Sequence, residues 1–121
     1  MLIKELNNCG EFVAGDGAVL RELLHPQKGA LKIRYSLAHA KVIPGQTTRP
    51  HKLKTCEVYY ILKGEGMVNI DEASAEVYPG YAVYIPPDTT QYIKNIGSSD
   101  LEFLCIVDPA WRAEDEEVFL F

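Results

Sequence analysis

Cysteine and histidine are both scarce in this chain of 121 residues, which has three of each. Cys9, Cys56 and Cys105 form no C-x-x-C pair, and their odd number argues against a disulfide framework. The first residues also lack the apolar core of a signal peptide. Unpaired thiols are typical of a reducing compartment, so we expect a cytoplasmic protein.

The sequence also lacks basic clusters, long apolar runs and glycine-rich phosphate loops. Its formal net charge is −5, and its largest basic group is Lys52 and Lys54 around Leu53. Nucleic acids and anionic membranes are therefore not expected as partners. No apolar segment approaches the roughly 18 residues that cross a membrane. The acidic run at 114–117 is interpreted as a solvated face.

What the chain does have is a series of short apolar segments separated by glycine and proline. Candidate strands are found at 31–43, 56–62, 67–71, 81–85, 91–96 and 101–107, with short strands in 1–14 and a strand or helical turn at 18–25. This pattern, without a long helix, predicts an all-β sandwich or barrel. The segment at 101–107 is apolar on both faces, which favours an interior strand. The N-terminal strands and the tail at 111–121, with at most one short helix, are expected to pair with a second subunit.

Three side chains with metal-binding or hydrogen-bonding groups lie near two of the predicted strands. His51 and Glu57 belong to one strand and its approach loop, and Gln91 begins another. If both strands line one pocket, an imidazole, a carboxylate and an amide converge there, and Tyr59 shares the face of Glu57. Imidazole with carboxylate suits Zn, Fe, Mn or Ni better than Mg or Ca. A hydrogen-bonded pair of His51 and Glu57 is the alternative.

The stretch from Gly45 to Gly64 resembles the first motif of the cupin superfamily. That motif runs from a glycine through two histidines and a glutamate to a second glycine. Gly45, His51, Glu57 and Gly64 fall at matching positions, and Leu53 stands in place of the second histidine.

The stretch from Gly80 to Asn95 is similar to the second cupin motif. Gly80, Pro86 and Asn95 match, whereas Asp88 replaces a glycine and Gln91 replaces the third histidine. The spacing holds through both motifs without a gap.

The resemblance implies a jelly-roll β-barrel and a single cupin domain over 1–121, with the motifs at 45–64 and 80–95 and an acidic C-terminal tail at 108–121. It also implies a divalent transition metal (Zn, Fe, Mn or Ni) held by His51, Glu57 and Gln91. Leu53 and Tyr59 are expected to line the ligand pocket. His39, on the strand before the Pro-Gly turn, is placed there too, with a structural or interface role as its alternative.

Two functions follow from this resemblance. The first is a small homodimeric cupin that binds a metal ion and an oxygen-rich small molecule, a sugar or an organic acid, as an enzyme or as a binding protein. The second is a metal-free cupin that binds a small molecule or serves as a dimeric scaffold. In the second case His51, Glu57 and Gln91 make hydrogen bonds to an organic ligand.

Overall fold

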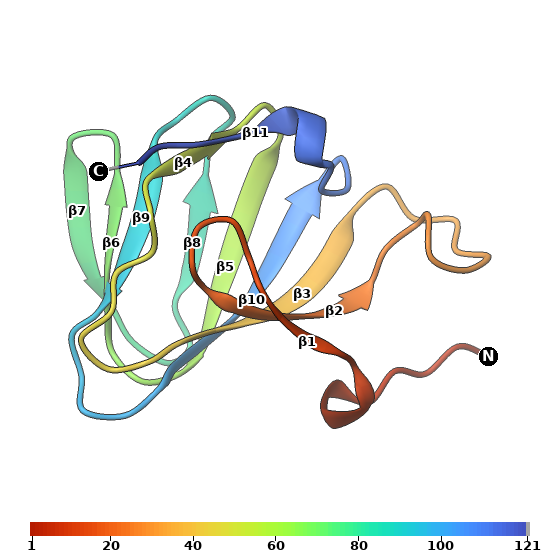
Figure 1. The fold of residues 1–121 in the computed structure, drawn as a ribbon, viewed down its shortest axis with the longest axis horizontal. Coiled ribbons are helices and arrows are strands. Elements are labelled where there is room, and N and C mark those ends of the chain that lie inside the picture. Colours follow the sequence, from red (N-terminus) through yellow and green to blue (C-terminus); the bar gives the residue numbers. More distant parts are fainter. Residues whose placement is uncertain (121) are drawn as a thin grey trace.

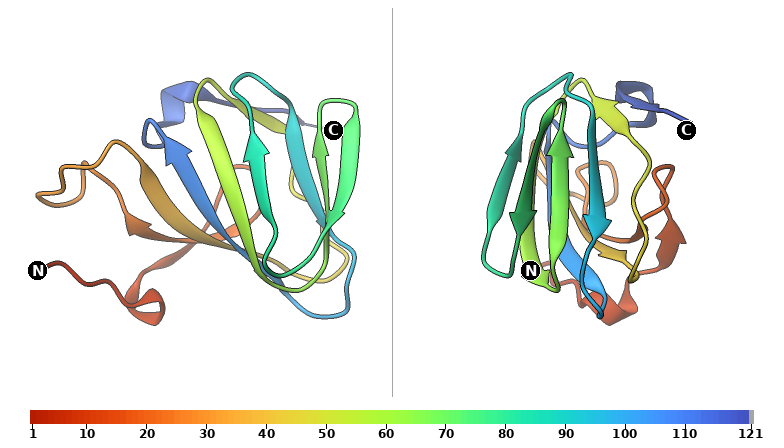
Figure 2. Two further views of the ribbon diagram at one scale, coloured as in Figure 1. Left: turned by 180° about the vertical axis from the view of Figure 1, so that it is seen from behind. Right: turned by 90° about the vertical axis from the view of Figure 1, so that its left-hand side faces the viewer.

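The computed structural model describes residues 1–120 and folds them into two facing β-sheets (Figures 1 and 2). One sheet has six strands in the order β1-β2-β3-β10-β5-β8, and the other has five in the order β11-β4-β9-β6-β7. The two layers are seen from the side in the right-hand view of Figure 2. This all-β architecture confirms the predicted jelly-roll barrel.

The first three strands belong to one sheet, and from β3 onward the chain passes back and forth between the sheets, except at the pair β6-β7. The six-stranded sheet contains β1 (Glu11–Val13), β2 (Val19–Leu24), β3 (Ser36–Val42), β5 (Cys56–Lys63), β8 (Ala82–Ile85) and β10 (Leu101–Asp108). The five-stranded sheet contains β4 (His51–Leu53), β6 (Gly66–Ile70), β7 (Ala73–Val77), β9 (Gln91–Asn95) and β11 (Glu116–Val118). Short 3-10 helices are formed by Leu6–Asn8 (η1) and Ala113–Asp115 (η2).

Three strands of the five-stranded sheet were not predicted as strands. β4 and β11 have three residues each, and the sequence pattern assigned them to a loop and to the tail. β7 alternates apolar and polar residues, but two of its three apolar residues are alanines, which are weak strand formers, and its first four residues are exposed. The prediction for β10 is confirmed, because this strand lies between β3 and β5 in the interior of its sheet.

Inward side chains of both sheets form the core, and Asn95 of the second motif connects the two sheets. Ile61, Ile93 and Phe103 are at most 1% exposed. The buried amide of Asn95 donates to the carbonyl oxygens of Val42 and Ser99, at 2.8 Å each, and so ties β9 to β3. Asn95 is therefore a structural residue of the second motif.

Gly64, the last residue of the first motif, is required by close backbone packing. Its φ is +85°, in the region that favours glycine. A Cβ at this position would lie 2.6 Å from the carbonyl oxygen of Asp100. Asp88, which replaces a motif glycine, has a φ of 61°. Aspartate tolerates this left-handed conformation, so the turn after Pro86-Pro87 keeps its shape.

The four sheet edges are β1 and β8 in one sheet and β11 and β7 in the other. β1 and β11 are each at the edge of a sheet, and pairing of these edges with a second subunit stays a prediction. Within residues 1–120, no helix is long and apolar enough to span a membrane. The three cysteines are free in the described chain. Phe121, the last residue of the predicted acidic tail, lies outside the described residues.

Candidate ligand-binding site

A cavity of about 510 Å³ lies inside the barrel. Its wall is formed largely by inward-facing side chains of β2, β3, β4, β5 and β10, together with the loop after β1. Apolar contacts come in part from Phe12, Leu20, Leu53, Phe103, Val107 and Trp111. A mostly apolar cavity of this size with a few polar groups is the usual form of a small-molecule site.

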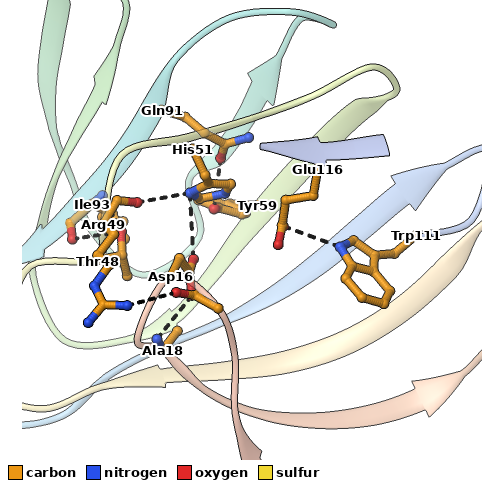
Figure 3. Close-up of polar contacts among 11 residues, drawn as sticks. Asp16, Ala18, Thr48, Arg49, His51, Tyr59, Gln91, Ile93, Trp111 and Glu116 are labelled. Atoms are coloured by element: carbon orange, nitrogen blue, oxygen red, sulfur yellow. Dashed lines mark hydrogen bonds and ion pairs between the residues drawn. The ribbon is translucent and has the colours of Figure 1, made fainter. Parts of the chain in front are cut away.

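His51 is buried in this wall at the start of β4. Its Nδ1 lies 3.1 Å from the carbonyl oxygen of Arg49 and 3.7 Å from Oδ2 of Asp16 (Figure 3). Both neighbours are acceptors, so the ring proton is assigned to Nδ1. The Nε2 atom of His51 is then left with a free lone pair.

Tyr59, Gln91 and Glu57 form a buried polar chain between the two sheets. The hydroxyl of Tyr59 on β5 donates a 2.8 Å hydrogen bond to Oε1 of Gln91 on β9 (Figure 3). Burial, together with the charge of Glu57, raises the pKa of Tyr59 well above its ordinary value, so the hydroxyl keeps its proton. Gln91 also hydrogen-bonds Glu57 through its side chain. The amide is thereby held between the phenol and the carboxyl group.

Glu57 is the group best placed for chemistry at neutral pH. Burial raises its pKa to about 8, a hydrogen bond from Gln91 opposes the shift, and the charges of Asp16 and Glu116 add to it. Its Oε1 atom is buried and has no hydrogen-bond partner among the described residues. A carboxyl group with such a pKa can give or take a proton near neutral pH. Its unpartnered oxygen is also suited to contact a ligand in the cavity.

Asp16 is a site residue that the sequence marked only as part of a turn. The backbone N–H of Ala18 donates to its Oδ1 at 3.0 Å, which fixes the side chain in the Gly15–Gly17 loop. The N–H of Arg49 donates to the carbonyl oxygen of Asp16 at 2.7 Å. This second contact docks the loop against the approach to β4 and places Asp16 beside His51. An aspartate between two glycines is the only signal in the sequence.

Glu116 and Trp111 bring the C-terminal region into the cavity wall. Glu116 on β11 is opposite Leu53 on β4 in the strand register. The indole N–H of Trp111 donates to Oε2 of Glu116 at 3.2 Å (Figure 3). Both side chains line the cavity. The interpretation of the acidic run as a solvated face is therefore corrected for Glu116, because β11 turns this side chain inward.

The structure brings together most of the predicted site residues, but not all. His51, Leu53, Glu57 and Tyr59 line the cavity, and Gln91 lies behind them in contact with Tyr59.

His39 does not line the cavity, which corrects its placement in the ligand pocket. Ser36, Ala38 and Ala40 of β3 face the cavity, so alternation turns His39 to the outer face of the sheet. There its Nε2 lies 3.0 Å from Oε1 of Glu102.

The donors present do not fit the metal centre that the sequence resemblance implies. Leu53 has no donor atom, and Oε1 of Gln91 already accepts the hydrogen bond of Tyr59. Within residues 1–120, no group of three His, Cys, Asp or Glu side chains is arranged to hold a metal ion. Of the predicted ligands only His51 and Glu57 keep free donor atoms, and two protein ligands are fewer than transition-metal sites normally have.

Comparison with known proteins identifies one relative over almost the whole chain and another over 58% of it. An uncharacterised protein of Methanocaldococcus jannaschii is 41% identical over 117 residues, which cover 94% of this chain and 91% of the relative. An oxalate-binding protein of Thermotoga maritima is 32% identical over 71 residues, which cover 58% of this chain and 59% of the relative.

The same architecture is found among solved structures. The structure of a predicted oxalate decarboxylase from Thermotoga maritima superposes with a TM-score of 0.79 at 22% identity, covering 89% of this chain and 99% of the other. At this identity the likeness concerns the fold. A family model described as the cupin domain matches residues 38–107, which include both motifs. The chain therefore belongs to the cupin family.

Proposed function

We propose that this cupin binds an organic small molecule in its barrel without the help of a metal ion. The observation that carries the proposal is the buried Oε1 atom of Glu57, which has no partner within the described chain. A buried carboxyl oxygen without a partner costs about 1–3 kcal/mol. A ligand in the adjoining cavity can supply the missing contact.

The cavity has the properties of a binding site. Its volume of about 510 Å³ is within the range of small-molecule sites. Polar atoms of His51 and Glu57 would orient the ligand, and the surrounding apolar side chains would bury it. Tyr59 holds the amide of Gln91, and the side chain of Gln91 acts on the carboxyl group of Glu57.

The relatives support a small-molecule ligand and leave its class open. One of them is named an oxalate-binding protein, and the chain spans 59% of its length. The class expected from the sequence is an oxygen-rich molecule, a sugar or an organic acid. A sugar is compatible with the cavity, because its hydroxyl groups both donate and accept. An organic acid would bring a further negative charge next to Asp16.

Metal analysis of protein purified without added metal or chelator tests this proposal. We expect metal well below one equivalent, and a melting temperature that neither EDTA nor added Zn²⁺, Mn²⁺ or Ni²⁺ changes. One equivalent of metal that is lost in His51→Ala and lowered in Gln91→Ala would overturn the proposal in favour of the metal-dependent function.

We also propose that the protein is a homodimer. β1 is an edge strand that pairs within the chain with β2, and Phe12 and Val13 on it are 48% and 71% exposed. An exposed apolar edge of this kind favours pairing with a second chain. Light scattering of the purified protein measures the oligomeric state directly.

A further inference from the structure

Four carboxyl groups line the cavity, and the three other than Glu22 come from distant parts of the chain. Asp16 comes from the loop after β1, Glu57 from β5 and Glu116 from β11, and all three line the wall. Oε1 of Glu116 lies 3.5 Å from the position that a Cβ on Gly15 would take, so Glu116 reaches the loop that carries Asp16. The negative charges of Asp16 and Glu116 disfavour ionisation of Glu57 and so contribute to its raised pKa.

Little positive charge balances these groups. Lys28 is the single lysine or arginine in the described wall, and its Nζ already pairs with Oε1 of Glu22 at 2.7 Å. The Nδ1 proton of His51 faces the carbonyl oxygen of Arg49 and the carboxylate of Asp16. The interior of the barrel is therefore acidic, which disfavours anionic ligands such as dicarboxylates.

The atoms left free in the cavity are mainly acceptors. Glu57 is 6% exposed, and its Oε1 has no partner in the part of the chain that is described. The lone pair on Nε2 of His51 is also free. Two donors of the wall are already used, because Tyr59 donates to Gln91 and the indole of Trp111 donates to Glu116. The raised pKa of Glu57 leaves its carboxyl group protonated at neutral pH, and this proton is released when an ammonium group binds beside it, so that both carboxylate oxygens become acceptors. A complementary ligand is therefore a hydrogen-bond donor.

We propose that the cavity binds an organic cation, a protonated amine attached to an apolar body. The ammonium group lies among Asp16, Glu57 and Glu116, and the apolar body packs against Phe12 and Phe103. The faces of Tyr59 and Trp111 add aromatic surface that attracts a cation.

This proposal rests on the proposed metal-free binding function and narrows it to one ligand class. The test is calorimetric titration of the full chain at one pH with four probes: benzylamine, benzyl alcohol, benzoate and oxalate. We expect saturable binding of benzylamine and at least tenfold weaker binding of benzyl alcohol, because charge-assisted hydrogen bonds contribute about ten- to a hundredfold in affinity. Benzoate and oxalate are expected not to bind.

Substitutions of the carboxyl groups test where in the cavity the ammonium group binds. Glu116→Gln and Asp16→Asn keep the shape of each side chain and should each weaken benzylamine binding about tenfold. Glu117→Gln is the matched control, because Glu117 is the exposed neighbour of Glu116 on β11 and should leave binding unchanged. Thermal melting shows that each variant is folded before it is titrated.

Three other outcomes of these titrations would contradict the cation proposal. Stronger binding of benzoate, oxalate or benzyl alcohol than of benzylamine overturns the cation proposal but leaves a binding cavity. Benzylamine binding that survives both Glu116→Gln and Asp16→Asn unchanged overturns it too. No binding of any probe at millimolar concentration overturns the cation proposal and counts against the cavity as a binding site.

Discussion

The hydroxyl of Tyr59 donates a 2.8 Å hydrogen bond to Oε1 of Gln91 and thereby joins the two sheets of the barrel. Both residues are buried, with exposures of 4% and 1%. Tyr59→Phe would remove the donor and leave the amide oxygen unpaired. We expect a loss of about 1–3 kcal/mol in the free energy of unfolding, measured by urea denaturation. Tyr60→Phe, at the exposed neighbouring position, is the control; an equal loss in both variants would contradict the importance of this bond.

The pKa of Glu57 predicts how folding stability depends on pH. The value is 4.5 for an ordinary glutamate and about 8 in the folded protein, so the folded state holds a proton that the unfolded state releases. This contribution to stability is complete below pH 4.5 and is lost as the pH rises through 8. Because each unit of pKa difference corresponds to about 1.4 kcal/mol, we expect a change of a few kcal/mol.

Comparison with Glu57→Gln isolates this effect from the other titrating groups. The free energy of unfolding of the variant, measured in urea between pH 5 and 9 (roughly the range of the shift), should fall less with pH than that of the natural protein. Parallel curves for the two proteins would show that Glu57 is ionised throughout.

Leu53→His tests whether a missing donor explains the lack of a metal site. Leu53 is 3% exposed and shares the inner face of β4 with His51. An imidazole at this position would join His51 and Glu57, so we expect zinc binding to become at least roughly tenfold tighter. Calorimetry with Zn²⁺ measures the change. Lys52→His, on the opposite face of the same strand, should show no gain, and a gain in both variants would indicate surface binding.

Gly64→Ala should destabilise the barrel. The new Cβ would lie 2.6 Å from the carbonyl oxygen of Asp100, at a φ of +85° that alanine rarely adopts. We expect a loss of about 2 kcal/mol or more in the free energy of unfolding. Gly10→Ala is a suitable control, because a Cβ at Gly10 has no described heavy atom within 4 Å. Equal stability of the two variants would show that the backbone adjusts without strain.

A lysine in β1 tests the proposed dimer. Val13→Lys places a charge on the exposed edge strand, and charged edge residues oppose pairing between chains. We expect light scattering to detect a dimer of the natural chain and a monomer of this variant. Ser74→Lys on β7, an edge strand of the other sheet, should remain dimeric. A natural chain that is already monomeric would refute the dimer.

Local patterns in the sequence predicted the barrel because glycine and proline separate most of its strands. β4 and β11 were missed because three residues are too few to show an alternating pattern. Such strands form only when a neighbour supplies hydrogen-bond partners, as β4 does for β11. The register between them depends on the tertiary fold, which no local pattern contains.

Only the site residues that lie within the two motifs could be predicted from the sequence. His51, Glu57 and Tyr59 were identified from motif position and strand alternation. Asp16 and Glu116 were missed because each reaches the cavity through a pairing distant in sequence, Asp16 with Arg49 and Glu116 with Leu53 in the register of β11 and β4. His39 was misplaced because both faces of its strand mix apolar and polar residues, so the sequence does not show which face is inward.

The short strand β11 contributes to the charge of the cavity. This strand supplies Glu116 to the cavity wall. It lies outside both cupin motifs and pairs with its sheet only through β4. A substitution in β11 can therefore change the charge that a ligand meets while leaving the motif residues and the core intact. Two cupins with identical motifs can thus select different ligands. Specificity in this barrel can evolve through its last strand.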